Sequence, residues 1–469
     1  MEHNPETVAV TDAPPRNPLP LRTQLAVIRR FDSGPEVLRD AGGPVTRLRL
    51  GPSSLVPQVV VATSPQAARD ILTHSPEKLE RTSVHDEIRN LLGPNLFDLR
   101  YRQWLPRRRV LQPIFTKQSV HQFGGHMAEI AEAVAHRWSD GARIDLDTEA
   151  RRVTLGALGR SVLGLDLESQ TDAVAEPVRT AISYTADRGA NPFRAPRWLP
   201  TPARRRARAA SAALHGLAGE ILQACRADPD LDAPLVQALI AARDPETGGE
   251  LSDAEIRGEL VVFMIAGHDT TSTTLTYAMW ALGHHNEIQN RVRAEVAGLG
   301  QRRLTPADVP QLRYTVAVLH EALRLCPPAP VVTRTATADI DVAGYRVEAG
   351  TELVVGISAM HRDPALWDRP LIFDPDRFSP ENSADRDRWQ YLPFGGGPRS
   401  CIGDHFAMLE ATLALATIIR DVEIHSSEDE FPVSTPFTAV AAGPVWAMVR
   451  KVAHGGPRAS RGRGCERTD

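Results

Sequence analysis

One long segment, from Asp253 to about His284, constrains what this chain can fold into more than any other feature. Ser252 and Glu255 have the spacing of a capping box, and the apolar-rich segment after them contains no proline. At 1.5 Å per residue, a helix over this segment is on the order of 48 Å long. A helix of that length crosses a whole domain, so we expect the other elements to pack around it.

The rest of the chain indicates a mainly α fold with a minor antiparallel β region, in a single large domain over residues 21–454. Helical patterns dominate from about residue 104 to residue 326. After Pro327, apolar and polar residues alternate between glycine turns, which is typical of a small antiparallel sheet. Residues 1–20 are expected to form a flexible arm and residues 455–469 a disordered tail.

Composition excludes several classes of protein. The chain has 54 basic and 58 acidic residues and a net charge of -4, so bulk charge disfavours binding to nucleic acid. Four scattered cysteines indicate neither a disulfide scaffold nor a CxxC zinc site. The first 20 residues are polar and proline-rich, and no window reaches the roughly 18 consecutive apolar residues of a spanning helix. We therefore expect a cytoplasmic protein without integral membrane contact.

The most informative short segment is the glycine-rich loop FGGGPRSCIG, from Phe394 to Gly403, which directly precedes a helical pattern. A thiolate at Cys401 is favoured by the dipole and the free N–H groups of the helix that follows. Successive glycines allow the backbone to lie close to a flat ligand. A thiolate suits iron, and Arg399 can pair with a carboxylate of the same cofactor. On the loop alone, a buried structural cysteine is the simpler interpretation.

In this loop the chain resembles the cytochrome P-450 family of haem-thiolate monooxygenases, whose haem-binding pattern FxxGxRxCxG it matches at every fixed position. The resemblance implies that Cys401 is the axial ligand to the iron of haem b. It also implies that Phe394, Gly397, Arg399 and Gly403 contact this cofactor. Further motifs extend the resemblance over nearly the whole chain, in the right order.

The long helical segment contains the sequence AGHDTT, which fits the family element AGxD/ETT. Small side chains at Ala266 and Gly267 leave room for a planar cofactor, and the Thr270 hydroxyl can bond back to the carbonyl of Ala266. Alone, the sequence can also be a helix with an incidental aspartate. The resemblance implies that Asp269 and Thr270 deliver protons to bound O2. His268 points to a different helical face, so we expect a structural or solvent role for it.

Glu321 and Arg324 stand at i, i+3 spacing, which alone is a common surface pair. In the family this ExxR element joins a later arginine in a buried network, and Arg377 in FDPDRF occupies the matching place. We expect these three residues to support the fold and the haem loop, not catalysis.

Four side chains are expected to bind the haem propionates. Trp104 and Arg108 fit the family's WxxxR helix, while Arg334 and Arg399 supply two further donors. Because proline is best tolerated in the first turn, Pro106 places the start of this helix near Trp104.

The neighbouring Arg107 and Arg109 have two interpretations. They form either a solvated face or, as the family suggests, part of a docking site for an acidic redox partner.

The substrate pocket is expected to include Phe263, Val331, Val332 and Phe437. Their apolar side chains favour a hydrophobic substrate. Its class is left open between lipids, terpenoids, steroids and polyketides.

The resemblance implies a monooxygenase that inserts one oxygen atom from O2 into this substrate, by hydroxylation or epoxidation. The chain has neither a GxGxxG loop after a strand nor an iron–sulfur cysteine cluster. We therefore expect electrons from NAD(P)H to arrive indirectly, through a ferredoxin and its reductase or a flavodoxin-type donor, and we expect a monomer. The alternatives are a peroxide-driven peroxygenase, a haem-thiolate isomerase or dehydratase, and a non-catalytic haem-thiolate ligand-binding protein. A substrate carried on a partner protein is also open.

Overall fold

The computed structural model describes residues 12–52, 56–74, 77–167, 171–190, 195–243 and 248–452. The expected tail, residues 455–469, and residues 1–11 of the expected arm lie outside these ranges. The described part of the arm lies alongside β1 (Val45–Leu48), because Asn17 donates to the carbonyl of Arg47 at 3.0 Å and Arg47 donates to that of Pro15 at 2.9 Å. This part therefore packs on the fold.

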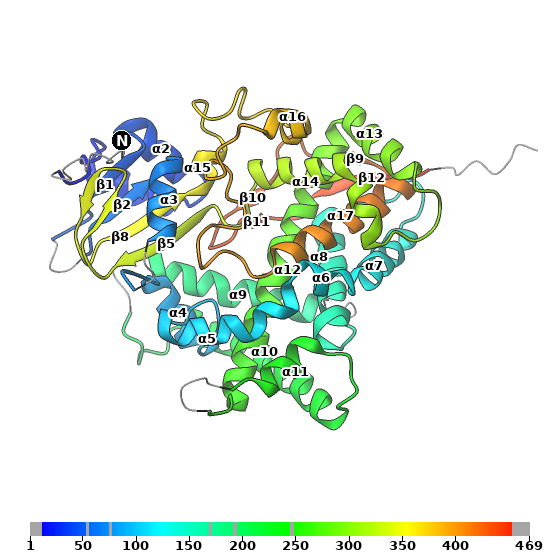
Figure 1. Cartoon of the computed structure of the whole chain (residues 1–469), viewed down its shortest axis with the longest axis horizontal. Coiled ribbons are helices and arrows are strands. Elements are labelled where there is room, and N and C mark those ends of the chain that lie inside the picture. Colours follow the sequence, from blue (N-terminus) through cyan, green and yellow to red (C-terminus); the bar gives the residue numbers. More distant parts are fainter. Residues whose placement is uncertain are drawn as a thin grey trace, which may run out of the picture.

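The predicted long helix is α12 (Asp253–His284), and it occupies the centre of the molecule (Figure 1). Its N-terminus has the expected capping box between Ser252 and Glu255. Residues around its whole circumference are buried along most of its length. Its most extensive contacts with other helices are those with α8 (Leu146–Leu158), α10 (Pro202–Ala227), α14 (Arg313–Leu325) and α17 (Asp404–Asp421).

The remaining helices surround this group. They are α1 (Leu21–Val27), α2 (Gly34–Gly42), α3 (Pro65–Thr73), α4 (Ser83–Leu92), α5 (Tyr101–Leu111), α6 (Lys117–His121), α7 (Gly124–Arg137), α9 (Thr171–Ala190), α11 (Pro234–Ala241), α13 (Asn286–Ala297), α15 (Ile357–His361) and α16 (Pro380–Ser383). Short 3-10 segments are η1 (Gln112–Phe115), η4 (Pro306–Gln311) and η5 (Pro375–Phe378), and η2 (Gly159–Leu163) is a π-helical turn.

The main sheet lies to one side of the helices (Figure 1). Its strand order is β1, β2 (Val59–Ala62), β8 (Glu352–Gly356), β5 (Val331–Ala336) and β3 (Leu79–Glu80). The pairs are antiparallel as predicted, except that β2 and β8 run parallel, with Val59 opposite Glu352. A parallel pair requires a crossover connection, and here the chain from α3 to α14 lies between its two strands.

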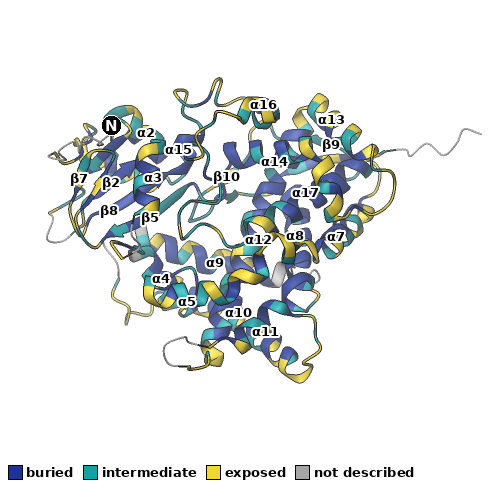
Figure 2. Ribbon diagram, viewed as in Figure 1, coloured by how far each residue is buried: buried dark blue, intermediate teal, exposed yellow. Residues whose placement is uncertain are grey.

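Smaller sheets complete the described β region. β12 (Trp446–Lys451) lies between β4 (Arg143–Asp145) and β9 (Val422–Ser426), while β6 (Ile340–Val342) pairs with β7 (Tyr345–Val347) and β10 (Val433–Ser434) with β11 (Val440–Ala441). Separate apolar clusters fill the space among the helices and against the main sheet. Buried residues are concentrated in the inner helices and in the strands of the main sheet (Figure 2). Among the described residues, no helix has the length and apolar character needed to cross a bilayer.

The prediction that one helix starts near Trp104 was wrong. Helix α5 begins at Tyr101, so Pro106 lies inside it. A proline there removes one backbone donor. The Trp104 side chain is buried and stacks on Tyr101 with ring centroids 6.0 Å apart. The backbone N–H of Trp104 donates to the carbonyl of Arg100 at 2.8 Å. This packing holds the first turn together ahead of the proline.

Candidate active site

The cysteine loop is shaped by its glycines. Gly395 and Gly397 have φ angles of 69° and 71°, in the left-handed region that favours glycine. A Cβ at Gly397 would lie 1.9 Å from the carbonyl oxygen of Leu72, so no other residue fits against α3 there. Gly397 thus serves the packing of the loop on α3, whereas a Cβ at Gly403 would meet open space.

Cys401 is exposed and ends this loop just before α17. Its N–H donates to the carbonyl of Phe394 at 2.9 Å, which closes the loop. Burial raises the pKa of the Cys401 thiol. The backbone N–H of Gly403 and the charge of Arg108 lower this pKa, but by less than burial raises it. An accessible sulfur surrounded by enough protein to desolvate it is suited to a soft metal ion, which deprotonates a thiol on binding.

Helix α5 is attached to the loop by two side chains. Arg108 donates to the carbonyl of Ser400 at 3.1 Å. The Arg399 guanidinium lies over the ring of Trp104, 4.7 Å from its centroid. The structure therefore brings Trp104, Arg108 and Arg399 together around the segment that holds the thiol.

Arg334 and Arg399 belong to a cluster of arginines with too few acids to balance them. Burial lowers the pKa of Arg399 to about 10, and burial followed by the charge of Arg399 lowers that of Arg334 to about 10 as well. The pKa of Arg81 is also lowered, first by burial and then by the charges of both other arginines. Two acids lie nearby: Asp98, and Glu80 with its Oε2 4.0 Å from Nη2 of Arg399.

Two buried donors in this cluster have no hydrogen-bond partner among the described residues: Nε of Arg81 and Nη2 of Arg399. Unsatisfied charged donors are costly, so the cluster suits a ligand that carries carboxylates. Haem has two propionates, and the residues present therefore fit it. Sequence reasoning missed Arg81 and also the buried His85, which lies 3.3 Å from Arg81. Arg81 lies just before α4 and His85 in its first turn, and this i, i+4 spacing was the available signal.

The two arginines beside Arg108 differ in their surroundings. Arg107 forms ion pairs with Glu259 at 2.5 Å and Glu255 at 3.4 Å, and its side chain is 10% exposed. The solvated-face interpretation is therefore wrong for Arg107, because the side chain links α5 to the first turns of α12. Arg109 is exposed.

The ExxR element is a buried network. Arg324 donates to both carboxylate oxygens of Glu321, at 2.6 and 2.7 Å, and both side chains are fully buried. Nε of Arg377 lies 3.4 Å from Glu321, whose Oε1 also accepts from the N–H of Asp374 at 2.9 Å. The three residues that the sequence grouped are therefore in contact.

Away from its two ends, helix α12 has one exposed residue. Ala266 is exposed and Thr270 is partly exposed, while most of the helix around them is buried. The Thr270 hydroxyl donates to the carbonyl of Ala266 at 2.8 Å, as expected. A Cβ at Gly267 would lie 2.9 Å from Leu158 of α8, so this glycine permits close packing of two helices.

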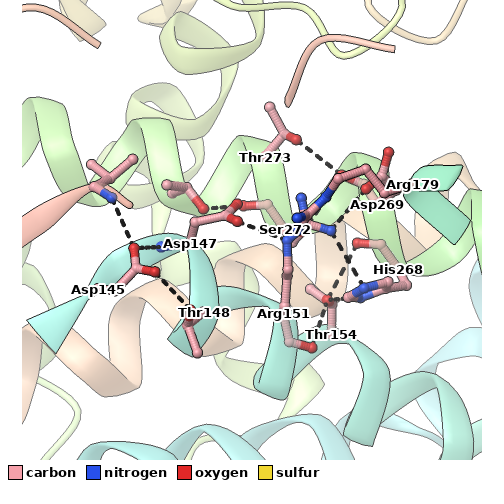
Figure 3. Close-up of polar contacts among 12 residues, drawn as sticks. Asp145, Asp147, Thr148, Arg151, Thr154, Arg179, His268, Asp269, Ser272 and Thr273 are labelled. Carbon is pink, nitrogen blue, oxygen red and sulfur yellow. Dashed lines mark hydrogen bonds and ion pairs between the residues drawn. The ribbon is translucent and has the colours of Figure 1, made fainter. Parts of the chain in front are cut away.

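Asp269 and His268 belong to a buried polar cluster between α12 and α8 (Figure 3). Asp269 accepts from Arg151 at 2.8 Å. His268 is fully buried, and its ring nitrogens lie 3.2 Å from the hydroxyl of Thr154 and 3.5 Å from Arg151. Burial, followed by the charge of Arg151, lowers the pKa of His268 to about 3. The structure thus favours the structural role for His268 over contact with solvent.

Of the expected pocket residues, Val331 and Val332 on β5 and Phe437 between β10 and β11 are partly exposed. Phe437 meets Phe97 edge-on, with ring centroids 5.9 Å apart. Phe263 is buried and stacks flat on Phe115, with centroids 5.4 Å apart, so the structure places it in the core.

A loop that presents a thiol, an unbalanced arginine cluster suited to two carboxylates and a helix with an acid beside a threonine together define a haem-thiolate enzyme. The family model for cytochrome P-450 matches residues 13–447, and the chain belongs to this family. It is therefore an oxidoreductase that uses haem b and O2.

Curated relatives and solved structures are similar over most of the chain. Cyclooctatin synthase of Streptomyces melanosporofaciens is 35% identical over 381 residues, covering 81% of this chain and 82% of its own. Pentalenene oxygenase of Streptomyces avermitilis is 32% identical over 400 residues, covering 84% and 87%. The crystal structure of the cytochrome P-450DA haem domain aligns with a TM-score of 0.81 at 26% identity, covering 94% of this chain and 98% of that one.

Proposed function

We propose that this chain inserts one oxygen atom from O2 into a C–H or C=C bond of a terpenoid, with electrons from separate partner proteins. The observation that carries the proposal is the accessible surface of α12 at Ala266 and Thr270, where Thr270 directly follows Asp269. The terpenoid class is supported by two relatives, whose names are pentalenene oxygenase and cyclooctat-9-en-7-ol 5-monooxygenase. The partly exposed apolar residues Val331, Val332 and Phe437 suit such a substrate.

When bound, the haem supplies an iron that binds and activates O2. Cys401 would hold this iron, and Arg81, Arg334 and Arg399 would bind the propionates. Phe394 and Gly403 would line the cofactor together with Ala266.

Thr270 and Asp269 are proposed to move protons. The Thr270 hydroxyl donates its own proton to Ala266, so its lone pairs are left to accept a hydrogen bond on the accessible side of α12. Asp269 adjoins it and can exchange protons at its carboxylate. This pair gives the chain a means of protonating reduced oxygen, for which a protein that only binds a ligand has no use.

We further propose that a ferredoxin, or a flavodoxin-type donor, docks near α5. Arg102 and Arg109 are exposed on this helix, and Arg108 links it directly to the cysteine loop. An acidic partner would be attracted to these charges and would lie on the side of the thiolate.

The test is reconstitution of the haem-loaded protein with a ferredoxin, its reductase and NADPH. The candidate substrates are pentalenene, a bicyclic monoterpene, a steroid and a fatty acid, and the gas is ¹⁸O-labelled O2. We expect a terpene product that carries one labelled atom. Product formation with hydrogen peroxide but not with the electron donors would contradict the proposal and favour a peroxygenase. A product from the steroid or fatty acid alone would contradict the terpenoid class.

A further inference from the structure

The turn between β10 and β11 is fixed to α12 by two side chains of that helix. Thr438 donates its hydroxyl hydrogen to Oδ2 of Asp269 at 3.0 Å. One turn further along α12, the Thr273 hydroxyl lies 3.0 Å from the carbonyl of Ala439. Phe437, which is expected to contact substrate, directly precedes Thr438, which bonds to Asp269. A residue of the substrate pocket and a partner of the acid are therefore neighbours in the same turn.

The two oxygens of Asp269 are held differently. Oδ1 accepts from Arg151 at 2.8 Å, and Arg151 is itself fixed by Asp147 at 2.8 Å (Figure 3). Burial alone would lower the pKa of Arg151, but the charges of Asp147 and Asp269 raise it, so Arg151 keeps its proton. A charge-assisted bond of this kind is stronger than one from a neutral hydroxyl. Oδ2, which faces Thr438, is therefore the oxygen that can change partners.

We propose that Thr438 is the positioning residue of Asp269, and that the turn transmits substrate contact at Phe437 to the orientation of this carboxylate. The inference rests on the proposed function. In the substrate-free protein, Thr438 holds Oδ2 toward the turn. Substrate that presses on Phe437 displaces the turn, the Thr438 bond opens, and Oδ2 becomes available on the side of Thr270. Proton delivery is thereby linked to substrate occupancy.

The experiment compares Thr438→Val, which removes the donor at nearly constant shape, with Thr438→Ser, which keeps it. Thr435→Val is the matched control, since the Thr435 hydroxyl lies in the same turn but contacts Asp32, at 3.2 Å. Each variant is made in the haem-loaded protein with and without Asp269→Ala, and Asp269→Leu, which also lacks an acceptor, serves if the alanine variant does not fold. The dissociation constant is measured from the change in haem absorption on binding. The ligand is whichever of the four candidate substrates named above shifts the absorption spectrum of the wild type most.

If substrate has to open the Thr438 bond, Thr438→Val binds the compound about three- to tenfold more tightly, because the bond no longer opposes binding. Thr438→Ser binds like the wild type, and the gain disappears when Asp269 is absent. Product formed per NADPH consumed falls in Thr438→Val and is restored in Thr438→Ser. The inference is overturned if Thr438→Val leaves the dissociation constant unchanged, or if it changes this constant equally with and without Asp269.

A second measurement needs no substrate. In the haem-loaded protein, Thr438→Val is expected to lower the thermal unfolding midpoint by about 1–3 °C more when Asp269 is present than when it is replaced. No difference would show that the two side chains are not coupled. Wild-type protein that makes no oxygenated product refutes the proposed function, whereas an active wild type with uncoupled variants refutes only this inference.

Discussion

Replacing Arg324 by leucine is the sharpest test of the buried network that supports the cysteine loop. Arg324 donates both to Glu321 and to three backbone carbonyls: those of His361 at 2.8 Å, Pro370 at 2.6 Å and Ile372 at 3.3 Å. It is fully buried, so water cannot replace it without a rearrangement. Removing it leaves a buried carboxylate and three carbonyls without their donor.

The magnitude follows from these contacts. Breaking a buried ion pair on one side costs about 3–5 kcal/mol, and each orphaned carbonyl adds about 1 kcal/mol or more. The expected loss of about 6–8 kcal/mol is comparable with the total stability of many proteins, about 5–15 kcal/mol. Replacing Glu321 by leucine as well removes the buried charge, but it also takes the acceptor from the N–H of Asp374 and a contact from Arg377. We therefore expect the double variant to be about 1–2 kcal/mol more stable than the single one.

The assay is urea unfolding of the haem-loaded protein, followed by tryptophan fluorescence. Arg369→Leu is the control, because Arg369 forms an exposed ion pair with Asp368 and should change stability by less than about 1 kcal/mol. Burial raises the pKa of Glu321 even with Arg324 in place. The single variant should therefore regain stability as the pH falls and Glu321 is protonated. The reasoning would be refuted if Arg324→Leu lost no more unfolding free energy than Arg369→Leu. It would also be refuted if the double variant were less stable than Arg324→Leu alone.

Three further predictions concern the site itself. Burial lowers the pKa of His268 to about 3, so the folded protein binds fewer protons than the unfolded chain below about pH 6.5. The stability that neutral His268 contributes is therefore complete above about pH 6.5 and is lost as the pH falls toward about 3. His268→Gln should flatten the pH dependence of the unfolding free energy by up to about 1.4 kcal/mol per pH unit, and equal slopes in the two proteins would contradict this. Arg81→Leu should speed the transfer of haem to apomyoglobin about tenfold, and an unchanged rate would exclude Arg81 from the propionate site. Asp269→Asn combined with Thr270→Ala should lower product formation by about 10²- to 10⁴-fold. Unimpaired turnover would exclude this pair from proton delivery.

The features that the sequence predicted best are those carried by short linear patterns. The capping box and the absence of proline define α12 locally, and the ExxR spacing places Glu321 and Arg324 on one helical face. The cysteine loop is likewise contiguous, from Phe394 to Gly403. In each case the interacting residues lie within about ten positions of one another.

What the sequence did not predict depends on long-range partners. Arg81 has meaning as a cofactor residue only beside Arg334 and Arg399, which lie more than 250 positions later. Arg107 is a structural residue because Glu259, 152 positions away, faces it.

Side-chain packing also decided two local features. The lack of a side chain at Gly267 makes room for Leu158 of α8, a contact that no pattern within α12 encodes. Pro106 is accommodated inside α5 because the packing of Trp104 stabilises the turn before it.

The central claim is that Cys401 holds the iron of a haem in this fold. The most direct measurement is the absorption spectrum of the purified, reduced protein with and without carbon monoxide, beside the variant Cys401→Ser. A strongly red-shifted Soret band in the wild type that is absent from the variant is the predicted result. A wild type that binds no haem, or a variant with the same spectrum, would contradict the assignment and leave Cys401 as a structural cysteine.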